Sequence, residues 1–81
     1  MMVDELKTAL GHLEKGDWEA AHVIVQEDES ALASWMHAIV HLQEGDTGNA
    51  NYWFRRAEQA PVGIEAISTE LVKIKAELER E

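Results

Sequence analysis

Apolar residues recur at steps of three and four along most of the chain, the spacing that places them on one face of an α-helix. This spacing predicts five helices, at about 3–15, 17–27, 30–44, 47–60 and 64–80. Gly16 and Gly45 suit the left-handed position that ends a helix, and Asp17 and Asp46 can each cap the helix that follows. Pro61 is expected to end the fourth helix because its ring excludes a helical residue before it. The pattern therefore predicts an all-α fold.

The chain also repeats itself. Residues 9–17 and 38–46 carry the same order of residue types, and an alanine follows each copy at Ala21 and Ala50. A period near thirty is typical of stacked helical hairpins, each of which needs a neighbour to bury its apolar face. We therefore expect one domain over residues 1–81, with hairpins at about 3–28 and 30–60. A capping or oligomerisation helix is expected at about 63–80.

The second copy resembles the tetratricopeptide repeat. The residues that carry the resemblance are Gly45, Asp46, Ala50, Phe54, Ala57 and Pro61, with small Ala38 at the close-approach position of the preceding helix. The first copy matches at Ala9, Gly16, Asp17, Trp18 and Ala21. The resemblance covers residues 3–61 and has a period shorter than the family's usual length of about 34. It implies paired antiparallel helices.

The chain departs from that family at the two central positions of each first helix. The family has a large apolar residue and an aromatic there, whereas this chain has Thr8 with His12, and His37 with His41. The second copy is also similar to a group of short proteins with no assigned activity. The residues that it shares with that group are Trp35, His37, Ala38, His41, Glu44, Gly45, Asp46, Asn49, Ala50, Tyr52, Trp53, Arg56 and Ala57.

The resemblance places apolar residues on the groove of the repeat: Leu6, Leu10, Leu13, Trp35, Ile39 and Leu42. An open apolar groove of this kind would be an interaction surface. The last predicted helix has its own apolar seam, which consists of Ile64, Ile67, Leu71, Ile74 and Leu78. This seam could fold over the groove, or a second copy of the chain or a peptide helix could occupy it. The favoured hypothesis is a non-enzymatic module that binds a protein partner or forms a homodimer through this apolar surface.

A second hypothesis comes from the histidines. His37, His41 and Glu44 follow one another at steps of four and three, so a helix turns all three side chains to the same side. Two imidazoles and a carboxylate are a plausible set of ligands for zinc or iron, and His22 on a neighbouring helix is the obvious further ligand. The alternative is a polar helix flank in which the rings bond to backbone, Asn or Trp groups. No metal or other cofactor is predicted as the favoured outcome.

A third hypothesis is a binding or catalytic cleft without a metal. Its residues would be His22, His37, His41, Asn51, Tyr52, Arg55 and Arg56. Arg55 and Arg56 form the single basic doublet of the chain, and such a doublet can bind an anion. On the fourth helix, a solvated ladder of polar side chains explains Asn51 and Arg55 equally well. Trp18, Trp35, Trp53 and Phe54 are expected in the core, with a stacking platform as the alternative.

Composition narrows these hypotheses. Sixteen acidic residues against seven basic ones give a net charge of −9, which opposes binding to nucleic acid or to an anionic membrane. The chain has no cysteine, so disulfides and thiol chemistry are excluded. No secretion signal and no membrane span is expected, which favours a cytoplasmic location. No complete catalytic set is recognisable, and the sequence therefore leans away from an enzyme.

Overall fold

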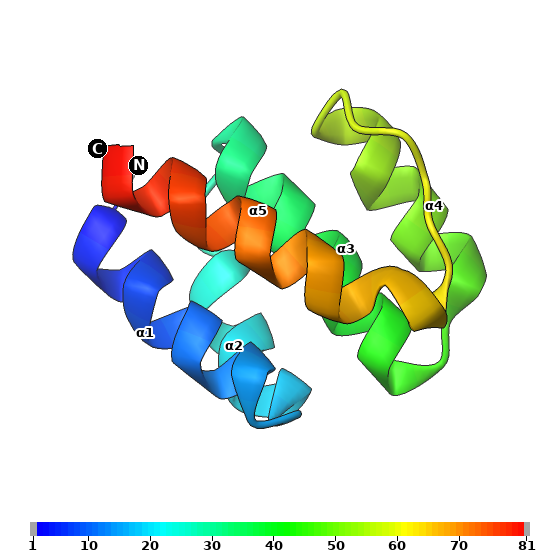
Figure 1. Cartoon of the computed structure of the whole chain (residues 1–81), viewed down its shortest axis with the longest axis horizontal. Helices are drawn as coiled ribbons and strands as arrows, with labels where there is room; N and C mark the ends of the chain where they lie inside the picture. The colour runs from blue at the N-terminus through cyan, green and yellow to red at the C-terminus, as the bar shows by residue number, and fades with distance from the viewer. Residues whose placement is uncertain (1, 81) are drawn as a thin grey trace.

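The computed structural model describes residues 2–80, which form an all-helical globule of five α-helices and one short 3-10 turn. The helices are α1 (Val3–Glu14), α2 (Trp18–Val25), α3 (Ala31–Glu44), α4 (Thr47–Arg56) and α5 (Ile67–Arg80), and the turn is η1 (Ile64–Ala66). Neighbours in sequence pack in pairs, α1 with α2 and α3 with α4, while α3 also contacts α1, α2 and α5 (Figure 1). The predicted all-α fold is confirmed.

The two Gly-Asp joints have the same local geometry. At the first joint Gly16 has a φ of 79°, and the backbone N–H of Asp17 donates to the carbonyl of His12 at 2.8 Å. At the second joint Gly45 has a φ of 91°, and the N–H of Asp46 donates to the carbonyl of His41, also at 2.8 Å. Both aspartates then cap the next helix by accepting a backbone N–H three residues on. These joints end one helix and start the next as predicted, because a Schellman turn and an N-cap need only neighbouring residues.

The predicted end of the fourth helix is wrong. Helix α4 ends at Arg56, not at the residue before Pro61. Glu58 takes the left-handed conformation with a φ of 59°, and the N–H of Gln59 donates to the carbonyl of Phe54 at 2.9 Å. This is the same Schellman closure as at the glycine joints, with a glutamate in the place of the glycine. Ala60 is consequently exposed in the link to η1.

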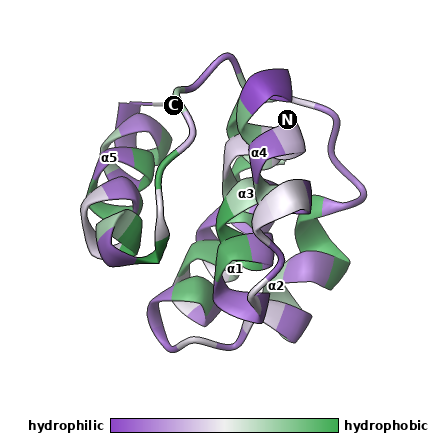
Figure 2. Cartoon of the chain, turned by 90° about the vertical axis from the view of Figure 1, so that its right-hand side faces the viewer, coloured by the Kyte–Doolittle hydropathy of each residue, from purple (hydrophilic) through white to green (hydrophobic). Residues whose placement is uncertain are grey.

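Helix α5 lies across α1 and α3 and covers their apolar residues (Figure 1). Figure 2 shows that α5 turns its hydrophobic side toward the other helices. Ile74 and Leu78 are fully buried on this side, whereas Val72 on the opposite side is 70% exposed. A polar contact adds to the packing, because the indole Nε1–H of Trp35 donates to Oε1 of buried Glu70 at 2.9 Å. Of the predicted seam, only Ile64 lies outside this contact, exposed in η1.

This covering corrects the predicted partner surface. Eight of its nine residues are buried inside the chain, namely Leu6, Leu10, Leu13, Trp35, Ile39, Leu42, Leu71 and Ile74, and Ile67 is partly buried against them. They are not an exposed surface for another protein. The physical reason is that two hairpins leave an apolar face that must be removed from water, and α5 covers it within the same chain. Of the three occupants of the groove considered from the sequence, the structure has the last helix of the same chain.

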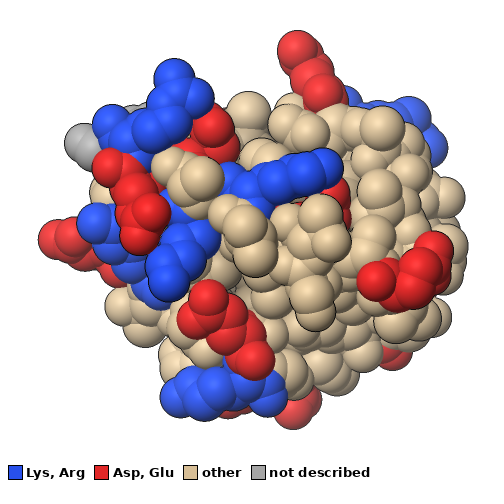
Figure 3. Space-filling view, in the orientation of Figure 1, with Lys and Arg blue, Asp and Glu red and all other residues tan. Residues whose placement is uncertain are grey.

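The surface of residues 2–80 carries charges of both signs. On the face seen in Figure 3, Lys and Arg side chains gather over one half and are interleaved with Asp and Glu. This face therefore offers no continuous basic surface of the kind that follows a phosphate backbone. None of the helices in the described part of the chain has the length and apolar character needed to cross a membrane.

Candidate metal-binding site

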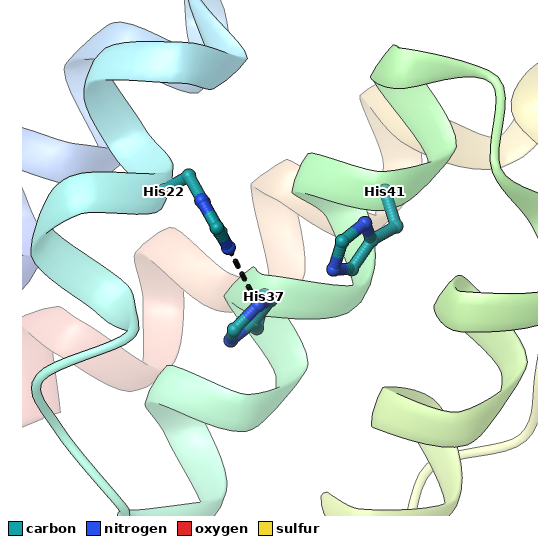
Figure 4. A group of neighbouring side chains, drawn as sticks. All are labelled: His22, His37 and His41. Atoms are coloured by element: carbon teal, nitrogen blue, oxygen red, sulfur yellow. Dashed lines mark hydrogen bonds between the residues drawn. The ribbon is translucent and has the colours of Figure 1, made fainter.

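Three histidines meet between α2 and α3. His37 and His41 lie one turn apart on α3, and His22 reaches them from α2 (Figure 4). The ring centroid of His37 lies 4.8 Å from that of His22 and 5.0 Å from that of His41. One nitrogen from each of the three rings lies within 4.8 Å of the others. We call His22, His37 and His41 the histidine cluster.

Two of the rings are joined directly. Nε2 of His22 and Nε2 of His37 lie 3.1 Å apart, at hydrogen-bond distance. One of these imidazoles must therefore donate its N–H to the lone pair of the other, so at least one of the two is uncharged. A neutral imidazole nitrogen with its lone pair directed at a neighbouring nitrogen is the form of histidine that binds metal ions. Only the accepting Nε2 carries such a lone pair in this hydrogen bond, so the donor ring must move its proton to Nδ1 before both Nε2 atoms can bind one metal ion.

His37 is the buried member of the cluster, with 5% of its surface exposed. The indole of Trp53 from α4 stacks on its ring, with centroids 3.8 Å apart and planes inclined by 9°. Burial, followed by the nearby charges of His22, His41 and Arg56, lowers the pKa of His37 from 6.5 to about 4. At neutral pH this imidazole is uncharged, and it needs to lose no proton before it can bind a metal.

His41 is held by a carboxylate on its own helix. Nδ1 of His41 lies 2.6 Å from Oε1 of Glu44, one turn further along α3. When the Nδ1–H donates to this carboxylate, the lone pair is on Nε2, the ring nitrogen that remains free. The side chain of His41 is 12% exposed. The Glu44 contact therefore sets both the orientation and the tautomer that a ligand histidine requires.

A second group of potential ligands consists of His41, Glu44 and Asp46. Asp46 already caps α4, because its Oδ1 accepts the backbone N–H of Asn49 at 3.2 Å and its Oδ2 accepts the Asn49 side-chain N–H at 2.8 Å. These hydrogen bonds, together with nearby His41, hold the pKa of Asp46 below its usual value. The carboxylates of this group are thus occupied in capping the helix and in orienting His41. The histidine cluster is the better candidate for a metal.

The α4 residues predicted for a cleft lie on two different sides of the helix. Tyr52 and Arg56 lie beside Trp53: the guanidinium of Arg56 is 4.9 Å from the centre of the Trp53 ring, and its Nη1–H donates to the Tyr52 hydroxyl at 3.4 Å. Asn51 and Arg55 lie two residues from Trp53 along α4, which turns them about 200° away from it. They are not part of the histidine cluster, and their place in a cleft stays a prediction.

Sequence reasoning had placed Trp53 in the core and did not assign it to the site. It is partly buried and forms the inner wall against which His37 is stacked. The pairing of α3 with α4 brings the two rings together, and no spacing along the sequence encodes a contact between residues sixteen apart on two helices. Of the alternatives considered for the histidines, bonding to Asn or to backbone is not observed within residues 2–80. The rings contact one another, Glu44 and Trp53.

Comparisons with protein-family models, with curated proteins and with solved structures found no match to this chain. The resemblance to the tetratricopeptide repeat therefore stays a prediction.

Proposed function

We propose that this protein binds a divalent transition-metal ion through His22, His37 and His41. The observation that carries the proposal is the convergence of three imidazole nitrogens within 4.8 Å, two of them already 3.1 Å apart. Two nitrogens that bind one tetrahedral zinc ion at 2.0–2.1 Å lie about 3.3 Å from each other. The pair from His22 and His37 has nearly this separation, and His41 needs a ring movement on the order of 1 Å to join it.

The ligand chemistry supports zinc, copper or nickel in preference to magnesium or calcium. Imidazole nitrogen suits the first three ions, while the last two prefer sets of oxygen ligands. The surroundings favour binding as well: His37 is uncharged at neutral pH, and Glu44 orients His41 from its far nitrogen. A carboxylate behind a ligand histidine is a recurrent feature of metal sites and strengthens the bond to the metal.

The competing function, an interaction module for a protein partner or a second copy of the chain, needs an exposed apolar surface. The residues expected to form that surface are buried under α5. The large hydrophobic residues that remain exposed, such as Val23 and Val72, lie on different helices. Scattered exposed apolar residues are ordinary on a protein surface and do not define an interface. The geometry therefore supports metal binding better than partner binding.

Isothermal titration calorimetry with ZnCl₂, CuCl₂ and NiCl₂ tests the proposal. The intact chain is expected to bind one equivalent of at least one of these ions. His22→Gln and His41→Gln should each abolish this binding. Glu44→Gln should weaken it by about 10–100-fold, the usual effect of losing a carboxylate behind a ligand histidine. His22 is only partly buried, so its substitution leaves the core packing intact, and far-UV circular dichroism checks that the helices remain.

His12→Gln is the matched control. His12 is also partly buried on a helix, and it belongs to neither group of potential ligands in residues 2–80. This variant should bind metal as the intact chain does. Uptake that survives in both His22→Gln and His41→Gln, or that is lost equally in His12→Gln, would show that the histidine cluster is not the site. Binding should also raise the melting temperature, since a ligand at 100 times its Kd stabilises the folded state by about 2.7 kcal/mol.

A further inference from the structure

We infer that a metal ion in the histidine cluster keeps one coordination position for water, and that small monodentate anions replace this water. The inference rests on the proposed function. In the described part of the chain the cluster supplies three ligands, whereas zinc and cobalt in such sites take four. The two nearest carboxylates are engaged elsewhere, Glu44 on Nδ1 of His41 and Asp46 on Asn49. The fourth ligand must therefore come from solvent.

Exposure within the cluster indicates where solvent enters. His37 and the stacked indole of Trp53 form the inner wall, while His22 is partly exposed on α2. His41 retains 12% exposure. A water molecule or a small anion can therefore reach the ion past His22 and His41, while the buried side at His37 is closed.

Charge determines the class of the exchangeable ligand. Three neutral imidazoles leave the full charge of +2 on the ion, which favours a negatively charged fourth ligand over water. Arg56 adds a positive charge on the α4 side, because its guanidinium lies 4.9 Å from the centre of the Trp53 ring that stacks on His37. The net charge of −9 for the whole chain opposes the approach of large polyanions. Azide, cyanide and small carboxylates are thus the ligands that the site should accept.

The test uses Co²⁺ as the probe, because its visible absorption bands report the number and type of its ligands. Titration of the protein with CoCl₂ should produce the strong bands of four-coordinate cobalt at one equivalent. Addition of sodium azide should then shift these bands along a saturating curve with one azide per cobalt. His12→Gln should behave in the same way, and His22→Gln should give no such bands.

The outcomes separate the two ideas. If cobalt produces the four-coordinate spectrum and azide leaves it unchanged at every concentration, the fourth position is closed by the protein, and the inference is wrong while the metal site stands. If none of cobalt, zinc, copper and nickel binds, the proposed function fails and the inference fails with it. A spectral shift with azide that persists in His22→Gln would place the cobalt elsewhere and would overturn both.

Discussion

Lowering the pH from neutrality toward 4.5 is expected to destabilise this fold through one residue, His37. The folded structure holds the pKa of His37 at about 4, chiefly by burial and then by the nearby charges of His22, His41 and Arg56, whereas its ordinary value is 6.5. Between these values the unfolded chain binds a proton that the folded chain does not. The free energy of unfolding must therefore fall as the pH falls through this window, and the contribution is fully present above pH 6.5.

The magnitude follows from the two pKa values. A difference of about 2.5 between them, at 1.36 kcal/mol for each, gives an upper limit of about 3.4 kcal/mol. At about pH 4.5 most of this has been lost, so the expected decrease is about 2–3 kcal/mol relative to neutral pH. For a domain of this size, that is a large part of a total stability of about 5 kcal/mol. Half of the stability could therefore depend on one uncharged imidazole.

Urea denaturation followed by far-UV circular dichroism, at about pH 7 and about pH 4.5 and without added metal, measures this decrease. In His37→Gln the difference between the two pH values should fall below about 1 kcal/mol, because the group that titrates is gone. His12→Gln should keep the full difference. An intact chain that is equally stable at the two pH values would refute the reasoning, and so would a His37→Gln variant that loses as much stability as the intact chain.

Between about pH 7 and about pH 4.5 the titration of His37 is separated from that of the two carboxylates whose pKa values are lowered. Burial raises the pKa of Asp28, but hydrogen bonds from the backbone N–H groups of Met2 and Ser30 outweigh it and hold the pKa below 3.8. Asp46 also has a lowered pKa, because of its bonds to Asn49. Groups of this kind contribute stability that is lost only as the pH falls below about 4. The contributions of Asp28 and Asp46 are therefore lost below the pH range of this measurement.

Three further outcomes can be checked by thermal or urea denaturation. Glu58→Gly should raise the free energy of unfolding by about 1 kcal/mol, because the left-handed conformation is unfavourable for a residue with a side chain and is readily adopted by glycine. Unchanged stability would mean that Glu58 is not strained. Ile74→Ala should lower the free energy of unfolding by about 2–5 kcal/mol, because it leaves a cavity under α5. Val72→Ala, on the exposed side of α5, should change it by less than about 0.5 kcal/mol. Equal effects of the two substitutions would contradict the observed packing of α5. Trp35→Phe should cost about 1–3 kcal/mol because buried Glu70 loses its indole donor, and Glu70→Gln, which keeps an acceptor, should cost less.

Features that depend only on neighbouring residues were predicted correctly from the sequence. The glycine and aspartate at each joint specify a helix end and a helix start within about six residues, and the structure has both where they were expected. Helical periodicity was likewise sufficient to place His37, His41 and Glu44 on one side of a helix. These predictions were correct because one turn of backbone carries all the information they need.

Sequence patterns were insufficient to place an element boundary where two possible helix ends lie close together. Pro61 was expected to end the fourth helix, but the Schellman turn at Glu58 ends it four residues earlier. The link that follows packs Val62 against the core, and this contact with distant parts of the chain is not contained in the local sequence. In the same way the apolar seam began later than periodicity indicated, with Ile64 exposed in the 3-10 turn.

The contacts of the histidines and the identity of the segment that covers the apolar groove depend on how the helices pack. His22 was a candidate ligand from the sequence, but its nitrogen meets that of His37 because α2 packs on α3, and Trp53 joins them because α4 packs on the other side. The groove residues were recognised correctly as apolar, yet whether they face a partner or the last helix depends on where α5 docks. Contacts between helices depend on the free energy of burying whole faces against one another, and no short stretch of the chain contains that quantity.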